Sequence, residues 1–222
     1  MGNIFPYNFI TIEGNIGAGK TTLSKMLSKR YNTRLILEQF ADNPFLPFFY
    51  ENQERYAFTV ELFFMTERHK QLQENLQQQS LFHDLVIADY FFLKTLLYAQ
   101  TTLKGEEFRL FKKLFDILNS TFANPDILLY LHRSTDNLLE NIKNRGRDYE
   151  KNITADYLND IRTNYFDFFK STGDIPIIIL DVTGISFQHD EHAFQTIANI
   201  LMKKYEIGVH HISLGEAMGS HG

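Results

Sequence analysis

A glycine-rich loop near the N-terminus has the residue types and the spacing of a phosphate-binding site. Residues 14–21 fit the pattern G-x-x-x-x-G-K-[ST]. In such loops backbone N–H groups turn toward the α- and β-phosphates, and the helix that follows adds its dipole. Lys20 is expected to reach the β- and γ-phosphates, and the Thr21 hydroxyl to bind Mg²⁺. The expected nucleotide-binding residues of this loop are Gly14, Asn15, Ile16, Gly17, Ala18, Gly19, Lys20, Thr21 and Thr22.

This loop alone does not distinguish a GTPase, an ATPase motor and a small-molecule kinase. The guanine-reading motif Asn-Lys-x-Asp does not occur in the sequence. The one Asp-x-x-Gly, at residues 181–184, follows the last predicted strand and comes too late to be a GTPase switch. These two observations argue against a GTPase.

Two carboxylates end predicted strands, which is where ligands bind in parallel sheets. Glu38 ends the second strand, and a neutral hydroxyl nucleophile benefits from a base that takes its proton. A carboxylate would repel an acceptor that is already a phosphate, so Glu38 favours a nucleoside as acceptor. Asp89 ends the third strand, where a second carboxylate commonly helps to hold Mg²⁺. The alternatives are a solvated Glu38 and an Asp89 that only caps a helix.

Glu61 is the one charged residue in the apolar run 58–65, and burying a lone carboxylate requires a partner or a purpose. Arg68 lies two helical turns further along the same face. The two side chains can form a satisfied ion pair. Alternatively, both can line a pocket and read the polar edge of a base.

Arg145 and Arg147 flank a glycine between two predicted helices. Two planar guanidiniums on a glycine-hinged loop suit phosphates that gain charge in the transition state. Loops of this kind close as lids over a bound nucleotide. The alternative is a solvated basic turn.

These residues lie on a chain in which predicted strands alternate with predicted helices. Short apolar strands are expected at 7–13, 35–38, 85–88, 126–131 and 176–181. Helical patterns cover 19–29, 53–79, 91–100, 106–118, 135–143, 154–169 and 191–204. The alternation predicts an α/β protein with the P-loop NTPase fold, in which a five-stranded parallel sheet is flanked by helices and carries a lid loop. We expect one kinase domain over residues 1–205 and a flexible tail over 206–222.

The composition limits the partners of the protein. With 222 residues, 44% of them hydrophobic, the chain suits one domain with a sizeable core. The absence of cysteine excludes disulfides, a cysteine nucleophile and thiolate metal sites. A formal net charge of −5 argues against nucleic acid polymers as partners, and no stretch is apolar for long enough to span a membrane. A cytoplasmic protein is expected.

Taken together, these segments resemble the deoxynucleoside kinase family, which includes the deoxycytidine, deoxyguanosine and deoxyadenosine kinases. The resemblance runs from about Tyr7 to Phe187. Its first motifs are the phosphate loop, Glu38 with Asn43-Pro44-Phe45-Leu46, Tyr50, and Arg55-Tyr56-Ala57-Phe58 before Arg68. It continues through Asn124-Pro125-Asp126, Arg145-Gly146-Arg147-Asp148-Tyr149-Glu150 and Tyr157-Leu158.

The resemblance implies transfer of the γ-phosphate of ATP to the 5′-hydroxyl of a deoxynucleoside, with Glu38 as general base and Asp89 helping to hold Mg²⁺. Tyr50 and Glu150 would hold the sugar 3′-hydroxyl. A homodimer that pairs through a helix bundle is also implied.

On the donor side, the resemblance makes Arg145 and Arg147 the lid arginines that bind the donor phosphates. The loop 181–187, which ends at Phe187, corresponds to the segment that covers the donor adenine.

Three positions depart from the family pattern. Tyr90 replaces the usual Arg after the strand-three acid, so a cation near the reacting phosphate is missing, and either another residue supplies it or turnover is slower. Glu61 stands where the family has a base-reading Gln, and Thr95 stands where an Asp often pairs with the pocket Arg. The last two changes look compensatory, because Glu61 could neutralise Arg68.

The change at position 61 bears on the base. An ionised Glu only accepts hydrogen bonds, whereas Gln also donates. Guanine presents two adjacent donors, N1–H and the 2-amino group, while adenine and cytosine set a ring acceptor beside the amino group. We therefore expect a purine deoxynucleoside, with deoxyguanosine ahead of deoxyadenosine.

Two other functions compete with this interpretation. A thymidylate-type monophosphate kinase has the same fold but an anionic acceptor, which Glu38 disfavours. A regulatory nucleotide-binding protein without catalysis is favoured only by Tyr90. A protein that only binds nucleotide has no use for the base Glu38, which argues against this second alternative.

Overall fold

The computed structural model describes residues 4–38, 43–77, 85–120, 122 and 124–219. Six parallel strands form one sheet in the order β2-β3-β1-β4-β5-β6. The strands are β1 (Phe9–Gly14), β2 (Arg34–Ile36), β3 (Val86–Ala88), β4 (Ile127–His132), β5 (Pro176–Asp181) and β6 (Gly208–Ser213). The α/β class with a P-loop is confirmed, but the expectation of five strands is wrong.

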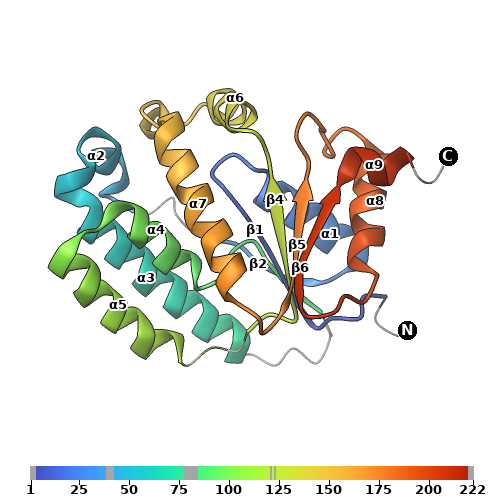
Figure 1. Cartoon of the computed structure of the whole chain (residues 1–222), viewed down its shortest axis with the longest axis horizontal. Coiled ribbons are helices and arrows are strands. Elements are labelled where there is room, and N and C mark those ends of the chain that lie inside the picture. The colour runs from blue at the N-terminus through green and yellow to red at the C-terminus, as the bar shows by residue number, and fades with distance from the viewer. Residues whose placement is uncertain (1–3, 39–42, 78–84, 121, 123, 220–222) are drawn as a thin grey trace.

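Helices cover both faces of the sheet (Figure 1). In Figure 1, α7 lies against one face with α3, α4 and α5 outside it, and α1 and α8 lie on the other. The helices are α1 (Lys20–Tyr31), α2 (Leu46–Glu51), α3 (Gln53–Gln77), α4 (Lys94–Thr102), α5 (Gly105–Asn119), α6 (Thr135–Arg145), α7 (Ala155–Ser171), α8 (Glu191–Leu201) and α9 (Leu214–Gly219). A short 3₁₀ turn, η1 (Asp148–Glu150), follows α6.

The central strands are buried almost throughout, as parallel strands with helices on both faces must be. Helix ends follow local sequence signals: the Ser134 and Thr154 side chains cap α6 and α7 by accepting backbone N–H groups. Gly146 ends α6 with a φ of 70°, a left-handed conformation that glycine adopts without strain. This turn separates Arg145 from Arg147 and directs the chain across the carboxyl end of the sheet.

The C-terminal segment differs from the expected flexible tail. Residues 208–213 form β6, which pairs with β5 from Pro176 to Asp181, and residues 214–219 form α9. The fold therefore extends about 14 residues beyond the boundary expected at residue 205, although residues 220–222 lie outside the described part of the chain.

Within the ranges that the structure describes, no helix combines the length and the apolar character of a membrane span.

Candidate active site

Two pockets meet at the carboxyl end of the sheet. Both are lined by Gly17, Lys20, Thr21, Arg145 and Arg147, which therefore mark their junction. The first pocket, here called the acceptor pocket, is also lined by Ile16, Glu38, Leu46, Phe49, Tyr50, Val60, Glu61, Phe64, Arg68, Lys94, Tyr98, Glu150 and Tyr157. The second, here called the donor pocket, is completed by Gly19, Thr22, Arg133, Asn141, Asn144, Ser186, Phe187 and Gln188.

The phosphate loop joins β1 to α1 and has the backbone that its sequence predicts. Gly17 and Gly19 have φ values of 81° and 97°. A Cβ on Gly17 would lie 2.8 Å from the Leu138 carbonyl oxygen, so only glycine fits there. The Asn141 side chain donates to the Gly17 carbonyl at 2.8 Å, which ties the loop to α6. The loop is thus held open for an anion at the N-terminus of α1.

Lys20 lies at the junction of the two pockets. Its ammonium group donates to the backbone oxygens of Gly14 and Asn15, both at 2.9 Å. Burial and then the nearby Lys94 lower the pKa of Lys20 to about 8. A half-buried ammonium whose partners, in the part of the chain that the structure describes, are neutral carbonyls is suited to exchange them for phosphate oxygens.

We expect the affinity for ATP to fall as the pH rises through 8. The unliganded protein loses the Lys20 proton near pH 8, whereas bound phosphates hold it, so binding above pH 8 must take up a proton. The dissociation constant should rise roughly tenfold between pH 7.5 and 9. Calorimetry in buffers of different ionisation enthalpy measures both the affinity and the proton uptake.

The Lys20→Met variant is the control for this titration, because it retains every other ionisable group, including those of ATP. Its affinity should be lower and should vary less with pH. An equal pH dependence in both proteins would contradict the assignment to Lys20.

The donor pocket is closed on one side by Phe187, which is buried against the phosphate loop. A Cβ on Gly19 would lie 2.9 Å from the Phe187 ring. Arg133 holds the neighbouring segment by donating to the backbone oxygens of Ala18 and Ile185. Phe187 therefore lies beside the loop, where the sequence places a residue that covers the donor base.

Residues 145–150, which include the two expected lid arginines, contact the acceptor pocket through Glu150. This buried carboxylate accepts from Arg145 at 2.6 and 3.0 Å and from Arg147 at 3.3 Å. Tyr50 stacks on Tyr149, with ring centroids 6.3 Å apart, and also lines the pocket. The structure brings the expected lid arginines and the expected sugar-binding pair into one cluster.

The two residues expected to hold Mg²⁺ touch each other. The Thr21 hydroxyl donates to Asp89 Oδ2 at 2.5 Å, and the Glu38 backbone N–H donates to Oδ1 at 2.6 Å. A hydroxyl and a carboxylate are hard oxygen ligands of the kind that Mg²⁺ takes beside substrate phosphates. The residues present therefore fit a magnesium ion at the mouth of the phosphate loop.

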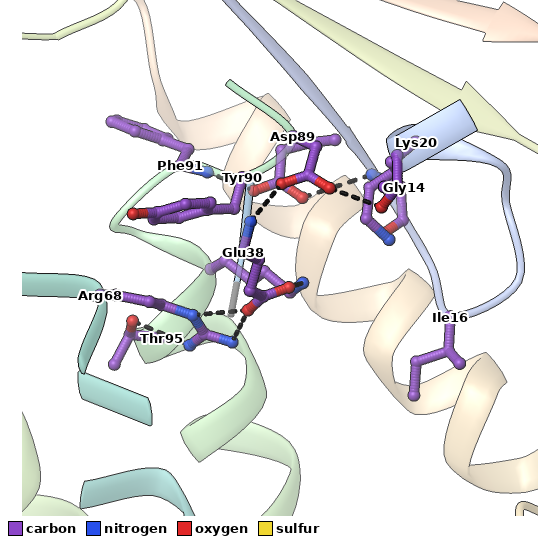
Figure 2. Close-up of polar contacts among 12 residues, drawn as sticks. Gly14, Ile16, Lys20, Glu38, Arg68, Asp89, Tyr90, Phe91 and Thr95 are labelled. Carbon is purple, nitrogen blue, oxygen red and sulfur yellow. Dashed lines mark hydrogen bonds and ion pairs between the residues drawn. The ribbon is translucent and has the colours of Figure 1, made fainter. Parts of the chain in front are cut away.

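Glu38 lies beyond the end of β2 and is buried between two cations, Arg68, which Figure 2 shows beside it, and Lys94. Its Oε1 accepts from Arg68 Nε at 2.8 Å and Nη2 at 2.5 Å, and its Oε2 accepts from Lys94 at 2.6 Å. Burial alone would raise the pKa of Glu38, but Arg68 and then Lys94 outweigh it and hold the pKa far below its usual range. The carboxylate is therefore ionised at every physiological pH.

The ion pair considered between Glu61 and Arg68 is not the one that forms. Among the residues that the structure describes, Arg68 pairs with Glu38, and its Nη1 donates to the Thr95 hydroxyl at 3.0 Å (Figure 2). The Glu61 charge nevertheless helps to raise the pKa of Arg68, after the larger effect of Glu38, so the compensation of Thr95 by Glu61 stays a prediction without a direct ion pair. The expectation that Glu61 and Arg68 line one pocket is confirmed.

Glu61 lines the acceptor pocket as a buried residue. Its Oε1 accepts from the Thr102 hydroxyl at 3.0 Å, whereas its buried Oε2 has no hydrogen-bond partner among the residues that the structure describes. Burial, opposed by Arg68 and Thr102, raises the pKa of Glu61 to about 7. Since a buried polar atom normally has a partner, this oxygen is suited to a ligand.

Sequence reasoning missed Lys94 and Glu13. Lys94 begins α4 and is only 5% exposed, while the fully buried Glu13 accepts from the Phe91 N–H and the Tyr165 hydroxyl. A charged residue inside the apolar run of β1 was a signal for Glu13. Lys94 gave no such signal, because a lysine near the start of a helix is usually solvated.

Comparison with known proteins relates this site to a family. Residues 10–205 match the family described as deoxynucleoside kinase. A deoxyguanosine kinase of Bacillus subtilis (strain 168) is 36% identical over 194 residues, which cover 86% of this chain and 94% of that protein. The deoxyadenosine/deoxycytidine kinase of the same strain is 29% identical over 202 residues, or 86% and 90% of the two chains. The structure of a deoxyadenosine kinase from M. mycoides with bound dATP has the same fold, with a TM-score of 0.75 at 24% identity over 88% of this chain and all of that one.

Proposed function

The chain belongs to the deoxynucleoside kinase family, and from this premise we propose that it phosphorylates the 5′-hydroxyl of a purine deoxynucleoside, with guanine preferred to adenine. An ATP-dependent deoxynucleoside kinase activity follows from the family and from relatives that match most of the chain. The acceptor atom, the base and the roles of individual residues are our own assignment.

Glu38 carries the assignment of the acceptor. It lines the acceptor pocket together with Lys20 and the lid arginines, so it faces the junction where a γ-phosphate bound by the loop would end. An ionised carboxylate in this place repels an acceptor phosphate but can take the proton of a hydroxyl. The supported acceptor is therefore a nucleoside, with its 5′-oxygen beside Glu38.

The remaining polar groups of the pocket fit the rest of the substrate. Tyr50 and Glu150 lie on the lid side, where they can hold the sugar 3′-hydroxyl, and Arg145 and Arg147 can turn from Glu150 to the donor phosphates. Such guanidiniums stabilise the charge that develops on the transferred phosphoryl group.

Thr21 and Asp89 are the residues that would hold Mg²⁺. When bound, the ion supplies neutralisation of charge on the β- and γ-phosphate oxygens. Asp89 also fixes the Glu38 backbone, so the proposed metal site and the proposed base share one support.

Glu61 supports the choice of a purine. In its ionised form the carboxylate, of which Oε1 accepts from Thr102 and Oε2 is the oxygen suited to a ligand, can accept from N1–H and the 2-amino group of guanine. In its protonated form it can donate to N1 of adenine and accept from the 6-amino group. Because its pKa is raised to about 7, a rise in pH should shift the preference toward guanine.

We also propose a cytoplasmic homodimer. Leu110 and Ile117 on α5 are 51% and 67% exposed and lie two helical turns apart on one face, which supports an apolar contact between helices of two copies.

The experiment that tests the function is ADP release with Mg-ATP and each of four deoxynucleosides, with dTMP and guanosine as contrasts. We expect the highest kcat/KM for deoxyguanosine, and a ratio of deoxyguanosine to deoxyadenosine that rises from pH 6 to pH 8. Glu61→Gln should lower this ratio about tenfold or more and remove most of its pH dependence, because Gln does not titrate.

Other outcomes would redirect the assignment. An unchanged base preference in Glu61→Gln would contradict reading of the base by this residue. Turnover of dTMP alone would make the protein a monophosphate kinase. Binding of ATP without turnover of any acceptor would leave a regulatory protein.

A further inference from the structure

Lys94 is a buried cation to which the assignments above give no role. Its side chain is 6% exposed, and its Nζ lies 2.6 Å from Glu38 Oε2 and 5.3 Å from the centre of the Tyr98 ring. It lines the acceptor pocket together with Lys20. A lysine buried at this cost requires an electrostatic reason.

The charges around Lys94 favour an additional anion. Lys20, Arg68 and Lys94 all line the acceptor pocket, and Arg68 and Lys94 both pair with Glu38. Two ammonium groups that repel each other in one pocket are stabilised when an anion lies between them. The γ-phosphate would lie at the Lys20 end of this pocket, so the anion that fits is the phosphoryl group in transfer.

The two cations on Glu38 are held differently. Arg68 is fixed at three points, by two nitrogens on Glu38 and a third on Thr95. Lys94 makes one hydrogen bond to Glu38 from a flexible four-carbon stem. Lys94 can therefore leave Glu38, whereas Arg68 keeps it in position.

Position 90 supplies no competing charge. Tyr90 is fully buried, its hydroxyl donates to Gln71 at 3.1 Å, and its ring points away from Lys20 in Figure 2. Four residues later, at the start of α4, Lys94 brings an ammonium to the Glu38 carboxylate.

We propose that Lys94 is a catalytic residue that shifts from Glu38 to a non-bridging oxygen of the phosphoryl group during transfer. This inference rests on the proposed function. The 5′-oxygen forms a bond to the γ-phosphorus, the bond from that phosphorus to the bridging oxygen of ADP breaks, and the 5′-hydroxyl proton passes to Glu38. Departure of Lys94 frees Glu38 Oε2 to accept this proton, at the moment when the phosphoryl group gains charge.

The test compares ligands with and without the new phosphate. In Lys94→Met, we expect kcat to fall about 10²- to 10³-fold. The affinity for deoxyguanosine 5′-monophosphate should fall about 10- to 100-fold, while the affinity for deoxyguanosine changes less than about threefold. Lys94→Arg should restore part of both losses, and Lys70→Met, an exposed lysine on α3, should match the wild type.

If Lys94 had a purely structural role, the affinities and kcat of the variants would follow a different pattern. Equal weakening of nucleoside and monophosphate binding, or an unchanged kcat, would overturn the inference while wild-type turnover upholds the proposed function. Absence of wild-type turnover with every deoxynucleoside would overturn both. Thermal unfolding with and without ATP shows whether Lys94→Met is folded. If it is misfolded, Lys94→Arg is compared with an equally stable Lys94→Gln, which lacks the cation. The inference then requires that Lys94→Arg bind the monophosphate more tightly than Lys94→Gln.

Discussion

Replacing Glu38 by Gln is expected to lower kcat about 10²- to 10⁴-fold, with a much smaller change in the KM for the deoxynucleoside. The amide keeps the shape of the side chain and can still accept from Arg68 or Lys94, but it cannot take the 5′-hydroxyl proton. The loss should therefore appear in the chemical step, and single-turnover kinetics with saturating Mg-ATP measures it.

The same substitution leaves Arg68 and Lys94 buried without their carboxylate, so its effect on stability must be separated from its effect on catalysis. Thermal unfolding and ATP binding show how much folded protein remains. Glu38→Asp keeps the negative charge but sets it one methylene further from the substrate, and it should retain more activity than Glu38→Gln. Equal activity of the wild type and a folded Glu38→Gln would show that the transferred proton goes elsewhere.

Glu38 is only weakly basic in the unliganded protein. Two cations keep its pKa far below neutrality, which suits an anion more than a base. In the mechanism that we propose, proton transfer from a hydroxyl becomes favourable as the phosphoryl group competes with Glu38 for Lys94. The proposed base would then be activated by the arrival of the reacting group, so we expect little hydrolysis of ATP by water in the empty pocket.

The sequence predicted the central strands because each is a short apolar run bounded by turn residues. It did not predict β6, whose sequence Gly-Val-His-His-Ile-Ser is half polar. An edge strand has only one neighbour and keeps exposed positions such as Val209, so its pattern resembles that of a loop. Pairing with β5 along its whole length, which the sequence cannot reveal, stabilises it.

Individual site residues could be recognised where strand ends or glycine loops fix their place. The partner of Arg68 could not, because Glu38 lies 30 residues earlier in the chain and the competing Glu61 lies on the same helix as Arg68. Helical spacing favoured the near carboxylate, while the packing of α3 against the end of β2 selected the distant one. The pKa of Glu61 is raised mainly by burial, which depends on the same packing, so it could not be predicted from the sequence either.

Replacing Asp89 by Asn is expected to lower kcat about 10²- to 10³-fold and to raise the Mg²⁺ concentration needed for half-maximal activity. Metal stabilisation of transition-state charge is worth several kcal/mol, which corresponds to this range of rates. The amide oxygen can still accept from Thr21 or from the Glu38 N–H, so most of the local structure should persist. Activity is measured against Mg²⁺ at fixed ATP.

Asp116→Asn is the matched control, because Asp116 lies on the surface of α5 in an exposed pair with Lys112. It should reproduce the wild-type Mg²⁺ curve. If Asp89→Asn lost activity with an unshifted curve, Asp89 would act by positioning Glu38 through its backbone N–H, and the metal would depend on Thr21 and the phosphates alone. A curve shifted to higher Mg²⁺ concentration would mean that Asp89 has both roles. The same carboxylate would then position the proposed base Glu38 and help to hold the Mg²⁺ ion at the transferred phosphate.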